Sequence, residues 1–230
     1  MKVSAIIPAA GQGTRMGSST PKQYLLLKGQ PILHYTLQAF EACEWVNSVT
    51  LVVPAKDIGE ARKKWDYKIV KNIVEGGKER QDSVYNGFKA IDADTDIVIV
   101  HDGVRPFVTP DLIRRSIEAA QQFGAVITAI PVNDTIKQVD DEDFVTRTVD
   151  RNGLWRVQTP QAFQYAILDQ AFQKAVNDSY YGTDEASLLE NAGIKLKIIE
   201  GSELNIKITR KEDIILGEGI LYSGMFDGDR

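Results

Sequence analysis

Cysteine is almost missing from this chain of 230 residues, which contains Cys43 alone. A single cysteine cannot form a disulfide within the chain and cannot build a cysteine cage around a metal ion. Both kinds of internal cross-link are therefore excluded. The composition agrees with a reducing compartment, where disulfides are rare.

Long hydrophobic runs are missing as well. A membrane-spanning helix needs about 18 consecutive apolar residues or more, and no stretch of this sequence is that long. The apolar run from Val3 to Ala10 is short, contains Pro8 and lacks the cleavage region of a signal peptide. We therefore expect a soluble cytoplasmic protein with no membrane partner.

The sequence also lacks an excess of positive charge, since its formal net charge is -5. Nonspecific binding of DNA or RNA depends on a surplus of lysine and arginine, so this balance argues against a nucleic-acid partner. A basic pocket inside an acidic protein remains compatible with it. The sequence contains 43% hydrophobic residues and shows no internal repeats, which fits one α/β domain over residues 1–230.

Short apolar runs alternate with segments whose apolar residues follow helical spacing. Strands that are apolar throughout, separated by such helices, are typical of a mostly parallel sheet covered on both faces, so we predict a Rossmann-like α/β fold. Ligands of such sheets bind at the carboxyl ends of the strands. The predicted strands lie within residues 2–8, 48–54, 67–75, 95–102, 124–132, 194–201 and 204–209, and the predicted helices within 31–43, 80–91, 110–123, 166–176, 183–193 and 210–223.

The pattern changes over residues 133–152, where segments of period two flank an acidic turn from Asp140 to Asp143. This pattern predicts a long β-hairpin without a helix. An isolated two-stranded ribbon is marginally stable in water, so we expect this arm to pack on another surface. A second copy of the chain is the simplest candidate.

The first predicted strand breaks into a glycine-rich loop. Gly11 and Gly13 allow a sharp turn and present backbone N–H groups to anionic oxygens without an obstructing Cβ. A turn without a ligand would use the same glycines, but the two cations beyond them favour a triphosphate cradle. A guanidinium bridges two phosphate oxygens, and an ammonium adds a compact charge. The candidate residues are Pro8, Ala9, Ala10, Gly11, Gly13, Arg15 and Lys22.

A second glycine pair, Gly76 and Gly77, follows another predicted strand, and Ser83 lies near the start of the next helix. Two glycines permit a flat base to approach the backbone closely, and a serine hydroxyl can bond a ribose. A flexible connection with a serine at a helix start explains the same residues.

Asp102 comes directly after the apolar residues 97–100, where packing gives no reason for a charge. Mg²⁺ commonly takes one or two carboxylates together with substrate phosphates, which suits an aspartate at a strand end. An aspartate that caps a turn would look the same. We interpret His101 as a structural residue, and Arg105 as either an anion ligand or an ion-pair partner.

The late segments carry further donors suited to a small phosphorylated substrate, but spacing alone does not assemble them into one site. Thr183 is also the expected N-cap of the helix that follows it. We interpret Trp155 as a core residue. The candidate donors are Thr135, Arg151, Thr159, Thr183 and Lys207.

Taken together, the motifs resemble a known group of enzymes. The stretch "PAAGQGTRMG…PKQY" is similar to the signature of sugar-phosphate nucleotidyltransferases. The stretches "GGKERQDSV", "VHDGVRP", "DRNGLW", "QTPQ", "TDEAS" and "NIKIT", in this order, resemble the 2-C-methyl-D-erythritol 4-phosphate cytidylyltransferase family. The resemblance extends from Ala5 to about Arg210.

This resemblance implies cytidylyl transfer from CTP to 2-C-methyl-D-erythritol 4-phosphate, with Mg²⁺, in the non-mevalonate isoprenoid pathway. The substrate phosphate attacks the α-phosphorus of CTP in line and releases pyrophosphate. Because the nucleophile is already an anion, catalysis depends on positioning and on neutralising charge around phosphorus. The cations of the loop suit that requirement.

The resemblance also implies roles for individual residues. Arg15 and Lys22 would stabilise the transition state, and Arg151 and Lys207 would place the incoming phosphate. The hairpin would exchange between the subunits of a homodimer, so that arm residues serve the neighbouring site. Lys78 stands where relatives can carry an acidic residue, so base recognition would rest on the backbone. The remaining assignments are Pro8 to Gly13 for the nucleotide, Gly77 for cytosine, Ser83 for ribose, Asp102 for Mg²⁺ or substrate, and Arg105, Thr135, Thr159 and Thr183 for the substrate.

Other functions remain to be compared with this one. A ribitol 5-phosphate cytidylyltransferase would share most of the motifs and also use a polyol phosphate. A dinucleotide-dependent oxidoreductase is disfavoured, because Gly17 falls one residue beyond the fingerprint and no acidic residue ends the strand at 48–54. A non-catalytic nucleotide-binding module is disfavoured by Arg15, Lys22, Asp102 and Lys207.

Overall fold

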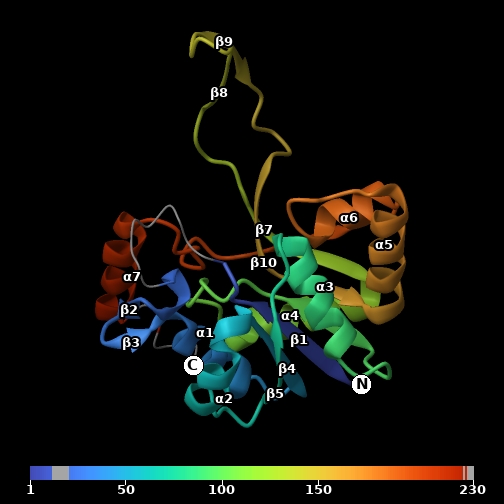
Figure 1. Ribbon diagram of the computed structural model, residues 1–230. Helices are drawn as coiled ribbons and strands as arrows, with labels where there is room; N and C mark the ends of the chain where they lie inside the picture. Colours follow the sequence, from blue (N-terminus) through green and yellow to red (C-terminus); the bar gives the residue numbers. More distant parts are fainter. Residues whose placement is uncertain (12–20, 225, 227–230) are drawn as a thin grey trace.

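The computed structural model describes residues 1–11, 21–224 and 226. Its centre is a seven-stranded sheet with the order β11-β7-β10-β6-β1-β4-β5 (Figure 1). All neighbouring strands of this sheet are parallel except β10, which runs antiparallel to both β6 and β7. The predicted α/β fold with a mostly parallel sheet is thus confirmed. The strands are β1 (Val3–Pro8), β4 (Ser48–Val53), β5 (Val70–Glu75), β6 (Ile97–Val100), β7 (Ala125–Pro131), β10 (Trp155–Gln164) and β11 (Lys197–Glu200).

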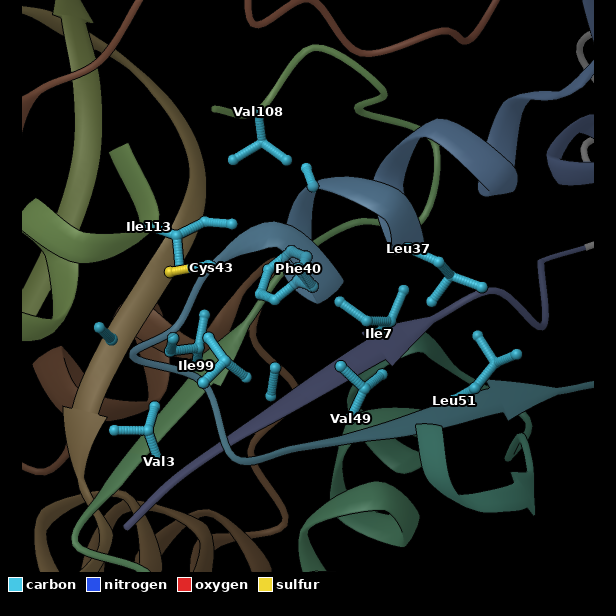
Figure 2. Packing of buried hydrophobic residues seen from close by; sticks show 14 of the residues in the cluster. Val3, Ile7, Leu37, Phe40, Cys43, Val49, Leu51, Ile99, Val108 and Ile113 are labelled. Carbon is cyan, nitrogen blue, oxygen red and sulfur yellow. The ribbon is translucent and has the colours of Figure 1, made fainter. Parts of the chain in front are cut away.

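Helices cover both faces of the sheet, and β1 shows why the sequence requires two layers. Val3 and Ile7 pack into the core on one face, whereas Ile6 packs into the core on the other, as the alternation of a strand demands. Figure 2 shows the first of these cores, where Phe40 and Leu37 lie against the strands. The first face carries α1 (Ile32–Ala42), α2 (Ile58–Lys64) and α4 (Pro110–Phe123), and the second carries α3 (Arg80–Ala90), α5 (Tyr165–Asp178) and α6 (Glu185–Asn191).

The C-terminal helix α7 (Lys211–Ser223) lies apart from these layers. It packs beside the small sheet of β2 (Leu26–Leu27) and β3 (Gln30–Pro31) in a third apolar cluster, which includes Phe107 and Leu221. The described residues also form two short 3₁₀ turns, η2 (Lys22–Tyr24) and η3 (Ala55–Asp57). Among the described helices, none combines the length and apolarity that crossing a bilayer requires.

The predicted hairpin forms an arm that extends from the rest of the chain (Figure 1). Its strands β8 (Ile136–Val139) and β9 (Val145–Val149) pair with each other in a sheet of their own. Phe144 and Val145, at and beside the turn, are 67% and 61% exposed. The arm therefore presents apolar side chains to the surroundings of this chain.

Several predictions of local structure are wrong. Residues 204–209 form no strand: Ile208 N–H donates to the carbonyl of Val104 (2.9 Å), whereas the N–H groups of Asn205 and Ile206 donate to carbonyls close by in sequence. The N-cap of α6 is Asp184, whose carboxylate accepts from the N–H of Ser187 (3.0 Å), and not Thr183. Trp155 is 39% exposed at the start of β10 and does not belong to the core. The helix α2 and the strand β10 had not been predicted.

Candidate active site

The fold brings the ends of β1 and β6 together at the point where the chain changes direction across the sheet. From β1 the chain adds β4 and β5 on one side, and then returns to place β6 on the other. Open α/β sheets bind ligands at such a switch point. Gly103 N–H donates to the carbonyl of Pro8 (3.3 Å), so the loop after β6 lies against the end of β1.

A cavity of about 370 Å³ opens at this point. Its walls come from segments that are far apart in the sequence: the loops after β1, β5 and β6, the turn η2, and the segment before α7. Most of the residues predicted to bind nucleotide or phosphate are brought together there. The lining residues are Pro8, Ala9, Ala10, Gly11, Lys22, Gln23, Gly77, Lys78, Glu79, Arg80, Ser83, Asp102, Val104 and Lys207.

Two predicted cradle residues, Gly13 and Arg15, lie outside the described residues, so their positions relative to the cavity stay predictions. The described part of the loop is fixed at Ala9. Its N–H donates to the carbonyl of Val52 (2.7 Å), and its carbonyl accepts from the buried amide of Gln23 (2.6 Å). Gln23 was not predicted, although it directly follows Lys22 in the motif.

The glycine pair after β5 approaches the first loop closely. A Cβ added at Gly76 would lie 2.3 Å from the Cβ of Ala10, a separation that no side chain tolerates. The N–H of Gly77 donates to the hydroxyl oxygen of Ser83 (3.0 Å), which itself donates to the carbonyl of Glu79 (3.1 Å). The glycines therefore let two loops meet at one wall of the cavity, and Ser83 stabilises that wall.

Asp102 is the centre of a buried charge cluster. Its Oδ2 atom is 2.7 Å from Nζ of Lys207 and 3.7 Å from Nε of Arg105, and its Oδ1 atom is 3.4 Å from Nη2 of Arg80. Burial alone would raise the pKa of the Asp102 carboxyl. The three cations outweigh burial and hold that pKa well below its usual range, so Asp102 is ionised at neutral pH.

The guanidinium of Arg80 is held from behind by a second carboxylate. Nη1 of Arg80 is 2.8 Å from Oε1 and 3.0 Å from Oε2 of Glu185, and Nη2 is 3.0 Å from Oε2. Neither residue was predicted, although Arg80 lies in the "GGKERQDSV" motif and Glu185 in "TDEAS". Charged residues inside two motifs already assigned to one site were the available signal.

Thr159 and Arg105 lie beneath the cavity and do not line it. The N–H of Asp102 donates to the Thr159 hydroxyl (3.1 Å), and that hydroxyl contacts Nδ1 of His101 (3.0 Å). Arg105 donates from Nη1 to the carbonyl of Asn205 (2.8 Å). In this structure both residues support Asp102 and its neighbours, and direct contact with a substrate stays a prediction for them.

His101 is structural, as predicted. It is fully buried, and its Nε2 atom lies 3.1 Å from the carbonyl of Arg105, so Nε2 carries the proton and Nδ1 accepts from Thr159. Burial lowers the pKa of His101 to about 4. The ring is therefore neutral at physiological pH and does not add charge beside Asp102.

Three predicted donors lie elsewhere in this chain. Thr135 and Arg151 belong to the exposed arm, where the guanidinium of Arg151 donates to the carbonyl of Asn133. Thr183 is exposed just before α6. None of the three is among the residues described as lining the cavity. Their proposed roles therefore need either a partner's arm or a substrate that reaches beyond the cavity.

The donor set at the cavity fits a metal ion that is shared with a substrate. Among the described residues, no group of three or more His, Cys, Asp or Glu side chains could enclose a metal. The carboxylates that line the described cavity are those of Glu79 and Asp102. One or two carboxylates with phosphate oxygens are a usual environment for Mg²⁺, so the set is compatible with a Mg²⁺–nucleotide complex.

A glycine-lined cavity at a switch point, with lysine and arginine around an ionised aspartate, defines an α/β enzyme that binds a nucleotide and acts on its phosphates. The comparisons identify the family. The model of the family described as "IspD: 2-C-methyl-D-erythritol 4-phosphate cytidylyltransferase" matches residues 3–223. This chain belongs to that family.

Individual relatives are similar to this chain over nearly its whole length. The 2-C-methyl-D-erythritol 4-phosphate cytidylyltransferase of Syntrophus aciditrophicus is 47% identical over 224 residues, which are 96% of each chain. The crystal structure of 4-diphosphocytidyl-2C-methyl-D-erythritol synthase from Anaerococcus prevotii has a TM-score of 0.83 at 34% identity, covering 96% of both chains. The cytidylyltransferase structure from Thermus thermophilus has a TM-score of 0.82 at 33% identity, covering 96% of this chain and all of that one.

Proposed function

We propose that this protein transfers the cytidylyl group of CTP to 2-C-methyl-D-erythritol 4-phosphate and releases pyrophosphate, a step of isoprenoid biosynthesis. One observation carries the proposal beyond family membership. Residues 8–11 at the start of the glycine loop line a single cavity at the switch point of the sheet, together with Lys22, Asp102 and Lys207 from distant parts of the sequence. The relatives described above bear the name of this activity.

The reaction forms one bond and breaks one bond at the α-phosphorus of CTP. A phosphate oxygen of the acceptor forms the new P–O bond, and pyrophosphate leaves with the electrons of the bond to the bridging oxygen. No proton has to be removed from an anionic nucleophile, so the chain supplies positioning and positive charge. Lys22, and Arg15 by motif position, would face the charge that develops on the phosphate oxygens.

Asp102 and Lys207 would place the acceptor phosphate and its counter-ion. Lys207 is partly exposed and its ammonium lies 2.7 Å from Asp102, so a small movement would exchange a carboxylate partner for a phosphate. Mg²⁺, if bound with CTP, would be held by Asp102 and would supply further neutralisation of phosphate charge. Gly77 and Ser83 would form the base and ribose end of the same cavity.

We further propose that residues 133–152 form a dimerisation arm that brings Thr135 and Arg151 to the cavity of a partner chain. The exposed apolar residues at the tip of the arm support this proposal, because a two-stranded ribbon of this kind gains stability when it packs on another surface. A closed two-fold pair of chains would cover both arms at once.

The test is pyrophosphate release from CTP and Mg²⁺, with 2-C-methyl-D-erythritol 4-phosphate and ribitol 5-phosphate offered in parallel. We expect strong preference for the methylerythritol acceptor. Preference for ribitol 5-phosphate would keep the mechanism but overturn the acceptor. Tight CTP binding without pyrophosphate release would show a nucleotide-binding module instead of an enzyme.

A further inference from the structure

Arg80 lines the cavity, but all three of its guanidinium nitrogens contact carboxylate oxygens. Nη1 contacts both oxygens of Glu185, Nη2 contacts Glu185 and Asp102, and Nε contacts Asp102 at 3.4 Å. A guanidinium has five N–H groups in a fixed plane, so these contacts occupy each of its edges. Arg80 is therefore placed as an internal counter-ion of two carboxylates, whereas Lys207 pairs with Asp102.

The two carboxylates do not share Arg80 equally. The contacts to Glu185 measure 2.8 to 3.0 Å, as expected for a bidentate charged pair, whereas those to Asp102 measure 3.4 Å. The Glu185 side chain is 1% exposed and that of Arg80 is 29% exposed. The buried partner thus holds Arg80 from the side that faces away from the cavity.

This unequal sharing leaves the carboxylate of Asp102 available to Lys207. Arg80 pairs closely with Glu185, and Lys207 lies 2.7 Å from the Oδ2 atom of Asp102. Without the charge of Glu185, the guanidinium would gain by closing the 3.4 Å gap to Asp102. Asp102 would then pair with the guanidinium of Arg80 and would hold Lys207, or a cation bound with the substrate, less strongly.

We propose that Glu185 is a positioning residue of the active site, which holds the guanidinium of Arg80 back from Asp102 so that this carboxylate stays directed at Lys207. This inference rests on the proposed function of the cavity and adds a residue that does not line it. A purely structural alternative exists, because the Glu185–Arg80 pair also ties α6 to α3. The alternative predicts altered stability with unaltered kinetic constants.

The first test compares Glu185→Gln with Glu190→Gln, which removes the same charge from an exposed position of the same helix. We expect kcat/KM for 2-C-methyl-D-erythritol 4-phosphate to fall about tenfold in Glu185→Gln, because Arg80 would draw Asp102 away from the position in which it places Lys207 and the counter-ion of the acceptor phosphate. The KM for CTP should change less than about threefold, since the glycine walls are untouched. Glu190→Gln should behave like the wild type.

The second test adds Arg80→Gln and the double variant Arg80→Gln/Glu185→Gln, because a residue that acts through Arg80 has no further effect once Arg80 is replaced. We expect the double variant to have the kcat/KM of Arg80→Gln within about threefold, so the two substitutions are not additive. Circular dichroism at the assay temperature establishes that each variant is folded. The double variant also covers the case in which Glu185→Gln alone unfolds because it leaves a buried charge uncompensated.

The outcomes separate this inference from the proposed function. An inactive wild type would overturn the function, and the inference with it. An active wild type with unchanged kinetic constants in folded Glu185→Gln would overturn the inference alone. A folded double variant whose kcat/KM is about tenfold below that of Arg80→Gln would also overturn it, because Glu185 would then act independently of Arg80.

Discussion

Asp102 keeps its charge although the protein buries it, because Arg80, Arg105 and Lys207 surround its carboxylate. A buried carboxylate without such partners would take up a proton instead. The arrangement stores positive charge at the cavity without exposing all of it to solvent. An anionic substrate can therefore replace an internal carboxylate as the partner of a lysine, and this replacement is how we interpret the contact between Lys207 and Asp102.

At the scale of single residues, substitution of Lys22 and Arg15 tests whether they stabilise the transition state. We expect Lys22→Ala and Arg15→Ala each to lower kcat by about 10²–10³, as for the loss of one group that stabilises charge in a transition state, with little change in folding. The measurement is the rate of pyrophosphate release at saturating substrates. Lys56→Ala removes an exposed lysine away from the cavity and serves as the control. Normal turnover in either loop variant would contradict the assignment of that residue.

His101 gives a prediction for pH. Burial lowers its pKa from 6.5 to about 4, so between these values the unfolded chain binds a proton that the folded chain does not. This contribution to stability is complete above pH 6.5 and is lost as the pH falls toward 4. The loss should amount to about 3 kcal/mol of unfolding free energy. We expect urea titrations to show this fall in unfolding free energy between pH 6.5 and 4 in the wild type and not in His101→Gln. If the unfolding free energy changes equally with pH in both proteins, His101 is excluded as the cause.

At the scale of elements, the apolar strands and amphipathic helices were predictable because burial on both faces leaves a visible pattern. The strand β10 was not, since its sequence "WRVQTPQAFQ" combines Gln158, Thr159 and Pro160, which are unusual in a central strand. The structure accommodates Pro160 within an irregularity between Val157 and Gln161, where the register to β7 shifts. Sequence periodicity does not reveal such a local break.

The contact between the loops after β1 and β5 gives a prediction at the same scale. In Gly76→Ala the new Cβ would lie 2.3 Å from the Cβ of Ala10, so one loop has to move. Overpacking of this kind costs about 1–3 kcal/mol, and we expect a lower melting temperature with a roughly tenfold higher KM for CTP. Gly59→Ala is the matched control in α2, where no atom lies within 4 Å, and it should be neutral or slightly stabilising. An unchanged KM in Gly76→Ala would contradict the loop contact.

At the scale of the whole molecule, the sequence allowed many of the residues that line the cavity to be predicted, but not Gln23 or Arg80, and not the partners of Arg80. Residues that line it were found because each follows a strand or belongs to a motif. The pair of Arg80 and Glu185 was missed because it joins positions 105 residues apart, and no local pattern reports such a contact. Tertiary structure alone shows that Thr159 and Arg105 lie below the cavity and that Arg80 lies between two carboxylates.

The arm gives the last prediction at this scale, because Arg151 lies on the extended arm and does not line the cavity described for its own chain. It can serve the cavity of a partner chain, or a substrate that reaches beyond the cavity of its own. Mixed dimers of Arg151→Ala and Lys207→Ala subunits distinguish the two arrangements. If the arm acts in trans, one site of each mixed dimer combines an intact body with an intact arm, while the other site carries both substitutions. Random association makes half of the dimers mixed, so about a quarter of the wild-type activity should return when two inactive variants are co-expressed. Activity that stays at the level of the separate variants would show that Arg151 acts within its own chain or not at all.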